Sequence, residues 1–263
     1  MKIDEIIQYI NGIRKIRTYF SNVFFTKTQL EAMMARGNLQ LFRDEGLLLL
    51  LEEDADLIRV YFYVQDDTSL EKIKKHIPKY DKPIITDVVG KNPQAETFAK
   101  ILTCNGFEQY SVFIRMSCSV PQLPPNADVS RVKYATSHDI DSIHELLYSE
   151  FDPLFSHIPG RDAIAIAIRK KEITVVRNAQ KIAGLAYFEV VSSKKICLRY
   201  FVVDRKYRGQ GIGKSLLVNT FNYHTNGTIY HLWIGTYNST IELYRQLNFK
   251  QDAMIDYILV FKG

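Results

Sequence analysis

A glycine-rich stretch in the second half of the chain carries residue types that bind a phosphate group. It runs Phe201-Val-Val-Asp-Arg-Lys-Tyr-Arg-Gly-Gln-Gly-Ile-Gly-Lys-Ser-Leu-Leu217, with three glycines at alternate positions. Glycine permits positive φ and leaves no Cβ between backbone and anion. The N–H groups at a helix start attract negative charge. The stretch therefore predicts a phosphate site, and the alternative is a plain surface turn before a helix.

The elements on either side of these glycines fit that chemistry. The apolar run 198–203 predicts a strand rich in β-branched and aromatic residues. Four apolar residues at helical spacing follow the loop and predict a helix that ends at Asn226-Gly227; they are Ile212, Leu216, Leu217 and Phe221. Strand, loop and helix in this order would place the glycines at a helix N-terminus.

Composition limits the classes of function that fit. Net charge is +5, and the Lys and Arg residues are spread along both halves without a dense basic block, which argues against nucleic acid as the main partner. No apolar run is long enough for a signal peptide core or a bilayer span, so no membrane is expected. The 3 cysteines have no CxxC spacing. We therefore expect a reduced, cytoplasmic protein without zinc or disulfides.

The first half of the chain predicts an α/β unit, residues 1–119. Isoleucines at three- and four-residue steps predict an opening helix over 3–16, and Thr28 with Glu31 predicts the capping box of a second helix, 28–36. A β-meander and then a helix, a strand, a helix and a strand should follow, at 39–43, 47–53, 57–64, 69–76, 83–89, 94–104 and 109–119. No residues that suggest chemistry stand out in this half.

A proline-rich segment predicts the domain boundary. Residues 120–128 hold three prolines and no helical period, so we expect an extended linker. The second domain is then 129–263. Its predicted strands are 129–135, 172–177, 181–191, 195–203, 228–236 and 253–261, and its predicted helices are 136–149, 161–171, the helix after the glycine loop, and 239–247.

The two halves share this order of elements, so a duplicated fold is the simplest account. Gly106-Phe107 of the first half aligns with Asn248-Phe249 of the second. In this alignment Leu102 takes the position of Tyr244, so only the second copy carries a phenol there.

Two motifs of the second half, in the right order and at the right distance, resemble the GNAT superfamily of acyl-CoA-dependent acyltransferases. The first is 203–217, whose signature positions hold Arg208, Gly211 and Gly213. The second is 232–249, where Asn238 and Tyr244 match residues that relatives use. Asn248 replaces the usual Gly before an aromatic, and Asn also tolerates a left-handed helix end. The resemblance covers roughly 129–263, and the first half resembles the fold only in its order of elements and in Asn105-Gly-Phe107. We therefore expect two tandem GNAT-like domains, the first degenerate, each a mixed, mostly antiparallel twisted sheet flanked by helices.

The resemblance also implies the co-substrate and the residues that hold it. Acetyl-CoA would bind along the motif strand, with its pyrophosphate on the glycine loop and its arm fixed by Asn238. No metal is implied. The implied contacts are Phe201, Val202, Val203, Arg208, Gly209, Gln210, Gly211, Ile212, Gly213, Lys214 and Asn238.

Acyl transfer to an amine requires an acid for the departing thiolate and a route for the amine proton. A phenol with a pKa of about 10 can protonate a thiolate while staying neutral itself, which suits Tyr244. The strand 230–236 carries no carboxylate, so Glu189 on the preceding strand is the leading candidate for the base. Alternatives are Glu150, Asp152, His157, ordered water and an amine that is already neutral.

We therefore expect an N-acetyltransferase that passes an acetyl group from acetyl-CoA directly to a small-molecule or peptide amine. A non-catalytic acyl-CoA-binding or scaffolding protein is the first alternative. A tandem enzyme that uses aminoacyl-tRNA is the second, against which the intact glycine loop and the dispersed charge argue. The acceptor and the oligomeric state have no sequence signal.

Overall fold

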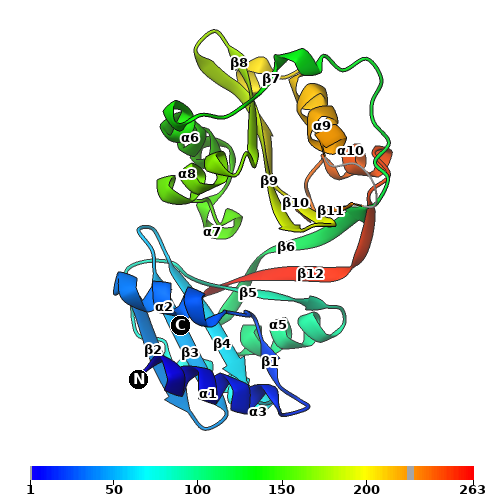
Figure 1. Cartoon of the computed structure of the whole chain (residues 1–263). Coiled ribbons are helices and arrows are strands. Elements are labelled where there is room, and N and C mark those ends of the chain that lie inside the picture. Colours follow the sequence, from blue (N-terminus) through cyan, green and yellow to red (C-terminus); the bar gives the residue numbers. More distant parts are fainter. Residues whose placement is uncertain (1, 224–227) are drawn as a thin grey trace. The chain divides into compact units, whose positions relative to one another are not determined.

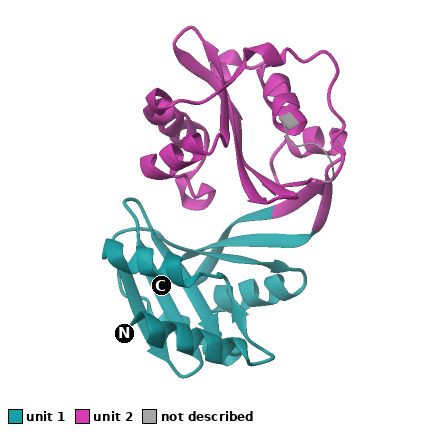
Figure 2. Ribbon diagram, viewed as in Figure 1, with its two compact units in different colours: residues 1–113, 253–263 teal, residues 114–252 magenta. Residues whose placement is uncertain are grey.

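The computed structural model describes residues 2–223 and 228–263 (Figure 1). The chain forms two compact units: unit 1 is Met1–Phe113 with Ala253–Gly263, and unit 2 is Ile114–Asp252 (Figure 2). Strands β6 (Phe107–Cys118) and β12 (Lys250–Phe261) each have residues in both units. This division differs from the predicted one at 120–128, because residues 253–263 count with the first unit.

Unit 1 is a mixed sheet with helices on both faces. Its helices are α1 (Ile3–Arg14), α2 (Lys27–Arg36), α3 (Asp67–Glu71), α4 (Ile73–His76) and α5 (Gln94–Cys104). Its strands, besides β6 and β12, are β1 (Phe20–Ser21), β2 (Leu39–Asp44), β3 (Leu47–Glu53), β4 (Ile58–Val64) and β5 (Ile84–Lys91). The order is β2-β3-β4-β5-β12, β4 and β5 run parallel, and β1 pairs with β4.

The five leucines of β3 explain why helices cover this sheet on both faces. Successive strand residues point to opposite faces. Leu47, Leu49 and Leu51 belong to one core cluster with residues of α5, whereas Leu48 and Leu50 belong to another with residues of α1. All five are buried. A run of this kind is typical of a strand that is covered on both sides.

Two carboxyl groups lie on one face of this sheet, Asp87 on β5 and Asp256 on β12. In the register Asp256 is opposite Val89 and Ile258 is opposite Asp87, so the two aspartates are diagonal neighbours. Burial, and next the charge of Asp87, raise the pKa of Asp256 well above its usual value. The Oδ1 atom of Asp256 is buried without a hydrogen-bond partner.

This raised pKa predicts that Asp256→Asn stabilises the protein at neutral pH. A carboxyl group whose pKa is higher in the folded state loses stability as the pH rises above its unfolded pKa. We expect the variant to gain about 1–3 kcal/mol of unfolding free energy at pH 8, and the gain to shrink as the pH falls toward about 4. Urea unfolding at both pH values measures this. The exposed Asp81→Asn is the control, and equal stability of Asp256→Asn and wild type at pH 8 would contradict the prediction.

Unit 2 has the same plan. Its strands, besides β6 and β12, are β7 (Val132–Tyr134), β8 (Ile173–Asn178), β9 (Lys181–Ser192), β10 (Lys195–Val203) and β11 (Ile229–Gly235). Its helices are α6 (Ile140–Glu150), α7 (Pro153–Ser156), α8 (Arg161–Arg169), α9 (Ile212–Tyr223) and α10 (Ile241–Gln246). The order is β7-β8-β9-β10-β11, antiparallel up to β10, with β10 and β11 parallel. As in unit 1, a meander leads into a parallel pair.

Two clusters cover the two faces of the sheet of unit 2. Residues of α9 and α10 pack with the side chains of Leu198 and Leu232 on one face. Residues of α6 and α8 pack with Tyr200 and Val202 on the other. Gly184 permits the close contact of α9, because a Cβ there would lie 3.0 Å from Cγ2 of Ile212 and 2.9 Å from the carbonyl oxygen of Val202.

Most predicted elements are present, and the differences lie at their ends. The capping box predicted at Thr28 and Glu31 is wrong: α2 begins at Lys27, and its capping box is formed by Thr26 and Gln29. The predicted helix 69–76 is divided into α3 and α4 at Lys72. The segment 151–160 holds the short α7, capped by Asp152, which no helical period predicted. The predicted helix end at 226–227 lies outside the described residues.

Candidate active site

Strands β10 and β11 part from each other halfway along β10. Their parallel pairing runs from Lys195↔Ile229 to Leu198↔Leu232 and ends there among the described residues. Strand β10 stays paired with β9 as far as Val203↔Gly184. The register between β9 and β10 shifts between Leu198 and Tyr200, so Arg199 is the extra residue of a bulge. Bulges bend a strand, and this one lies where the two strands separate.

The parting leaves one backbone edge of residues 201–203 without a strand partner. These are the residues expected to hold the arm of acetyl-CoA. A free strand edge offers N–H and C=O groups in a row to an extended ligand. The strand that leads into the glycine loop therefore offers such an edge.

The glycine loop lies between β10 and α9. Gly209 and Gly211 have φ of 80° and 75°, and a Cβ on either would meet no atom within 4 Å, so the loop is open on that side. Helix α9 follows directly, and its first N–H groups have no acceptor within the helix. Lys214, in its first turn, adds a positive charge. Open glycines at a helix N-terminus form a cradle that suits a phosphate group.

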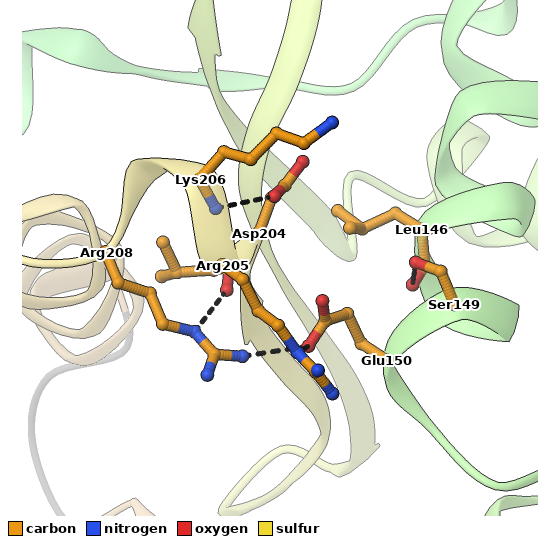
Figure 3. A network of polar contacts seen from close by, with 8 residues as sticks. Leu146, Ser149, Glu150, Asp204, Arg205, Lys206 and Arg208 are labelled. Carbon is orange, nitrogen blue, oxygen red and sulfur yellow. Dashed lines mark hydrogen bonds and ion pairs between the residues drawn. The ribbon is translucent and has the colours of Figure 1, made fainter.

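Arg208 contacts both β10 and the end of α6 (Figure 3). Its Nε donates to the carbonyl oxygen of Val203 at 3.0 Å, and its Nη2 pairs with Oε2 of Glu150 at 2.8 Å. Arg205 reaches the same carboxylate oxygen at 3.5 Å. The Glu150 side chain is only 11% exposed, whereas that of Arg208 is 56% exposed. Two of the five guanidinium N–H groups are used, so the exposed remainder can bind an anion.

Tyr244 lies on α10 in the same core cluster as Leu232 and Phe249. Its side chain is buried, and its ring packs edge-on against that of Phe249, with 5.7 Å between the ring centroids. Burial raises the pKa of Tyr244 far above that of an ordinary phenol. The hydroxyl group therefore keeps its proton at neutral pH.

The two asparagines of the second motif have different roles. Oδ1 of Asn238 accepts hydrogen bonds from N–H and Oγ1 of Thr240, at 2.9 and 2.7 Å. These bonds fix the side chain, which is exposed and can offer its amide nitrogen to a ligand. Asn248 has φ of 69° at the end of α10. The left-handed helix end predicted for Asn248 is thus confirmed.

The four candidate bases are in four different settings. Glu189 is half exposed on β9, with Oε2 3.8 Å from Nε of Arg199. Glu150 forms ion pairs with Arg205 and Arg208. Asp152 caps α7 by accepting from the N–H of Leu154 at 2.9 Å. His157 has φ of 47° and its carbonyl oxygen accepts from Tyr200. Of the three carboxylates, that of Glu189 is the most exposed.

His231 is a buried polar residue that the sequence analysis passed over. It lies on β11, 8% exposed, directly opposite Cys197. Its Nδ1 has no hydrogen-bond partner. Burial, then the charges of Lys195 and Arg115, lower the pKa of His231 to about 4. The only available signal was one polar residue in the apolar run Ile229-Tyr-His-Leu-Trp-Ile-Gly235.

Comparison with protein families identifies the centre of unit 2. Residues 169–251 match the model of the acetyltransferase (GNAT) domain. This range contains the parting strands, the glycine loop and Tyr244. The curated proteins gave no match.

Solved structures share the fold over most of the chain. A GCN5-related N-acetyltransferase from Kribbella flavida is 14% identical, with a TM-score of 0.56 over 89% of this chain and 95% of its own. One from Sphaerobacter thermophilus, also 14% identical, has a TM-score of 0.56 over 82% and 76%. A tandem GNAT protein from the clavulanic acid biosynthesis pathway is 15% identical, with a TM-score of 0.53 over 86% and 84%. The mixed α/β fold with helices on a twisted sheet is therefore that of GNAT proteins, as the motifs predicted.

Proposed function

We propose, since residues 169–251 match the model of the acetyltransferase (GNAT) domain, that unit 2 transfers an acetyl group from acetyl-CoA to an amine. One observation supports this most directly: the β10–β11 pairing ends at Leu198↔Leu232, beside a glycine loop with two left-handed residues. The fold supports acyl transfer from acetyl-CoA in general. The acceptor class, the acid and the base are proposals about this chain.

The proposed donor site follows from the geometry of the loop and strand. Gly209 to Lys214 would hold the pyrophosphate through their N–H groups. The exposed part of Arg208 would add donors for a phosphate oxygen. The free edge of residues 201–203 would bind the pantetheine arm. Asn238, which follows the end of β11, would help to fix that arm. Acetyl-CoA, when bound, supplies a thioester whose carbonyl carbon accepts the amine.

The proposed mechanism moves two protons, one to the sulfur that leaves and one from the nitrogen that attacks. Tyr244 donates its phenolic proton to the sulfur that leaves. Burial keeps Tyr244 protonated at neutral pH. Because the raised pKa also makes the phenol a weaker acid than a free one, Tyr244 first donates a hydrogen bond to the departing sulfur and gives up its proton only as the thiolate forms. Glu189 takes the proton that the nitrogen loses, directly or through water. Its exposed carboxylate can then return that proton to solvent.

Thermal unfolding with acetyl-CoA tests the donor site, and thiol release tests the reaction. Acetyl-CoA at about 100 times its Kd should add about 2.7 kcal/mol of stability and raise Tm by several degrees. A panel of small amines and peptides, read as free thiol release, should contain an acceptor. Stabilisation without any turnover would favour the acyl-CoA-binding alternative. No Tm shift at millimolar acetyl-CoA would contradict the proposed site.

A further inference from the structure

His231 lies at the point where β10 and β11 part. It is opposite Cys197 in the register, and Leu198↔Leu232 is the last pair. Side chains alternate along β11, and its Leu232 packs in the cluster of α9 and α10. His231 therefore lies on the opposite face, away from α9. On β9, the strand that flanks β10 on its other edge, Glu189 is the register partner of Cys197. The side chains of Glu189, Cys197 and His231 therefore form a row across three strands on one face of the sheet.

Nδ1 of His231 is buried and has no hydrogen-bond partner among the described residues. A neutral imidazole carries a proton on one ring nitrogen and a lone pair on the other. With the lone pair on Nδ1, the ring presents a buried acceptor that no donor satisfies. A buried acceptor without a donor is costly and uncommon. An N–H group of a ligand, or an ordered water, would satisfy it.

The charges around the ring keep it neutral. Lys195 on β10 and Arg115 on β6 disfavour the imidazolium form, and Asp252 on β12 favours it more weakly. Arg115 and Asp252 are themselves paired at 2.7 Å. With its pKa lowered to about 4, His231 is an acceptor and not a proton donor throughout the neutral range.

We propose that Nδ1 of His231 accepts a hydrogen bond from the attacking amine and so directs the nitrogen lone pair toward the thioester. The inference rests on the proposed function. The donor loop and Tyr244 lie with α9 and α10, whereas His231 lies on the opposite face of the sheet, one residue before the last β10–β11 pair. The carbon–nitrogen bond forms and the carbon–sulfur bond breaks. The nitrogen proton passes to Glu189, and the sulfur receives the proton of Tyr244.

This role requires an acceptor with at least two hydrogens on its nitrogen, one for His231 and one to lose. Primary amines meet this requirement. A secondary amine has only one hydrogen and would serve poorly, and a tertiary amine would not serve.

Two variants at His231 distinguish an acceptor from a packing group. Asn can place Oδ1 near the position of Nδ1, whereas Leu fills the space without an acceptor. We expect His231→Leu to lower kcat/KM for the amine by about tenfold or more, and His231→Asn to stay within about threefold. The KM for acetyl-CoA and the Tm shift with acetyl-CoA should be unchanged in both. Ile229→Ala, at an exposed position on the same face of β11, is the matched control.

A second readout works without turnover and on the wild-type protein. The ¹⁵N signal of Nδ1 in His231 should move when benzylamine is added in the presence of CoA, and triethylamine should not move it. Any one of three results would overturn the inference. The first is equal kinetics of His231→Leu and wild type, and the second is an equal loss of kcat/KM in the Asn and Leu variants. The third is an Nδ1 signal that does not move with a primary amine that the enzyme turns over. Failure of the proposed function is distinct, because wild type would then neither bind acetyl-CoA nor release thiol.

Discussion

Replacing Tyr244 by Phe is expected to lower turnover by about 10²–10⁴-fold and to leave acetyl-CoA affinity unchanged, because this is the usual contribution of a positioned acid. The substitution removes only the hydroxyl group. The ring and its edge-on contact with Phe249 remain, so the core that contains them should stay packed. The thiolate would then leave without a proton.

A second buried tyrosine of the same cluster gives a matched control. Burial raises the pKa of Tyr230 to about 12, and its hydroxyl group donates to the carbonyl oxygen of Phe221 at 3.0 Å. Tyr230→Phe should cost about 1 kcal/mol of stability and no turnover. Single-turnover kinetics of both variants with saturating acetyl-CoA measure the difference. Normal turnover in Tyr244→Phe would remove Tyr244 from the mechanism.

Gly211→Glu is expected to abolish detectable acetyl-CoA binding, with a loss of at least about 100-fold in affinity. A carboxylate in the phosphate cradle would lie within a few ångströms of the donor's charges, and such repulsion costs several kcal/mol. The protein should still fold, because a Cβ at Gly211 meets no atom within 4 Å. The φ of 75° adds a strain of about 1–2 kcal/mol.

Gly211→Ala separates strain from charge. It carries the same φ penalty without the carboxylate, so it should lose a similar amount of stability and keep affinity within about tenfold of wild type. Isothermal titration with acetyl-CoA, together with urea unfolding, gives both quantities. If Gly211→Glu binds as tightly as Gly211→Ala, the glycine loop is not the phosphate site.

Local patterns predicted the elements that carry the donor site. The glycines are followed by apolar residues at helical spacing, and the structure has a loop followed by α9 there. Asn248 was expected in the left-handed region because few residues other than Gly tolerate it, and its φ is 69°. The strand ends were predicted within three residues, because turns and apolar runs mark them. These features depend on residues close together in the sequence.

Features that depend on distant residues were not predicted. The bulge at Arg199 is a mismatch between two strands, and neither strand alone shows it. The pairing of Glu150 with Arg208 joins residues 58 positions apart. His231 became notable only when its burial, its unpartnered Nδ1 and its place beside the parting strands were known together. Nor does the sequence reveal that residues 254–261 pair with β5, since an apolar strand shows no preference for a partner.

The pairing of β12 with β5 has a consequence for how the chain is made. A nascent protein leaves the ribosome with its N-terminus first, and most domains can fold as they emerge. Unit 1 cannot complete its sheet in this way, because Ala253–Gly263 are synthesised after all of unit 2. Until then β5 has an exposed hydrogen-bonding edge, which is a site for misassembly. Nascent chains halted before residue 253 should therefore bind chaperones through unit 1, and release should coincide with the last strand.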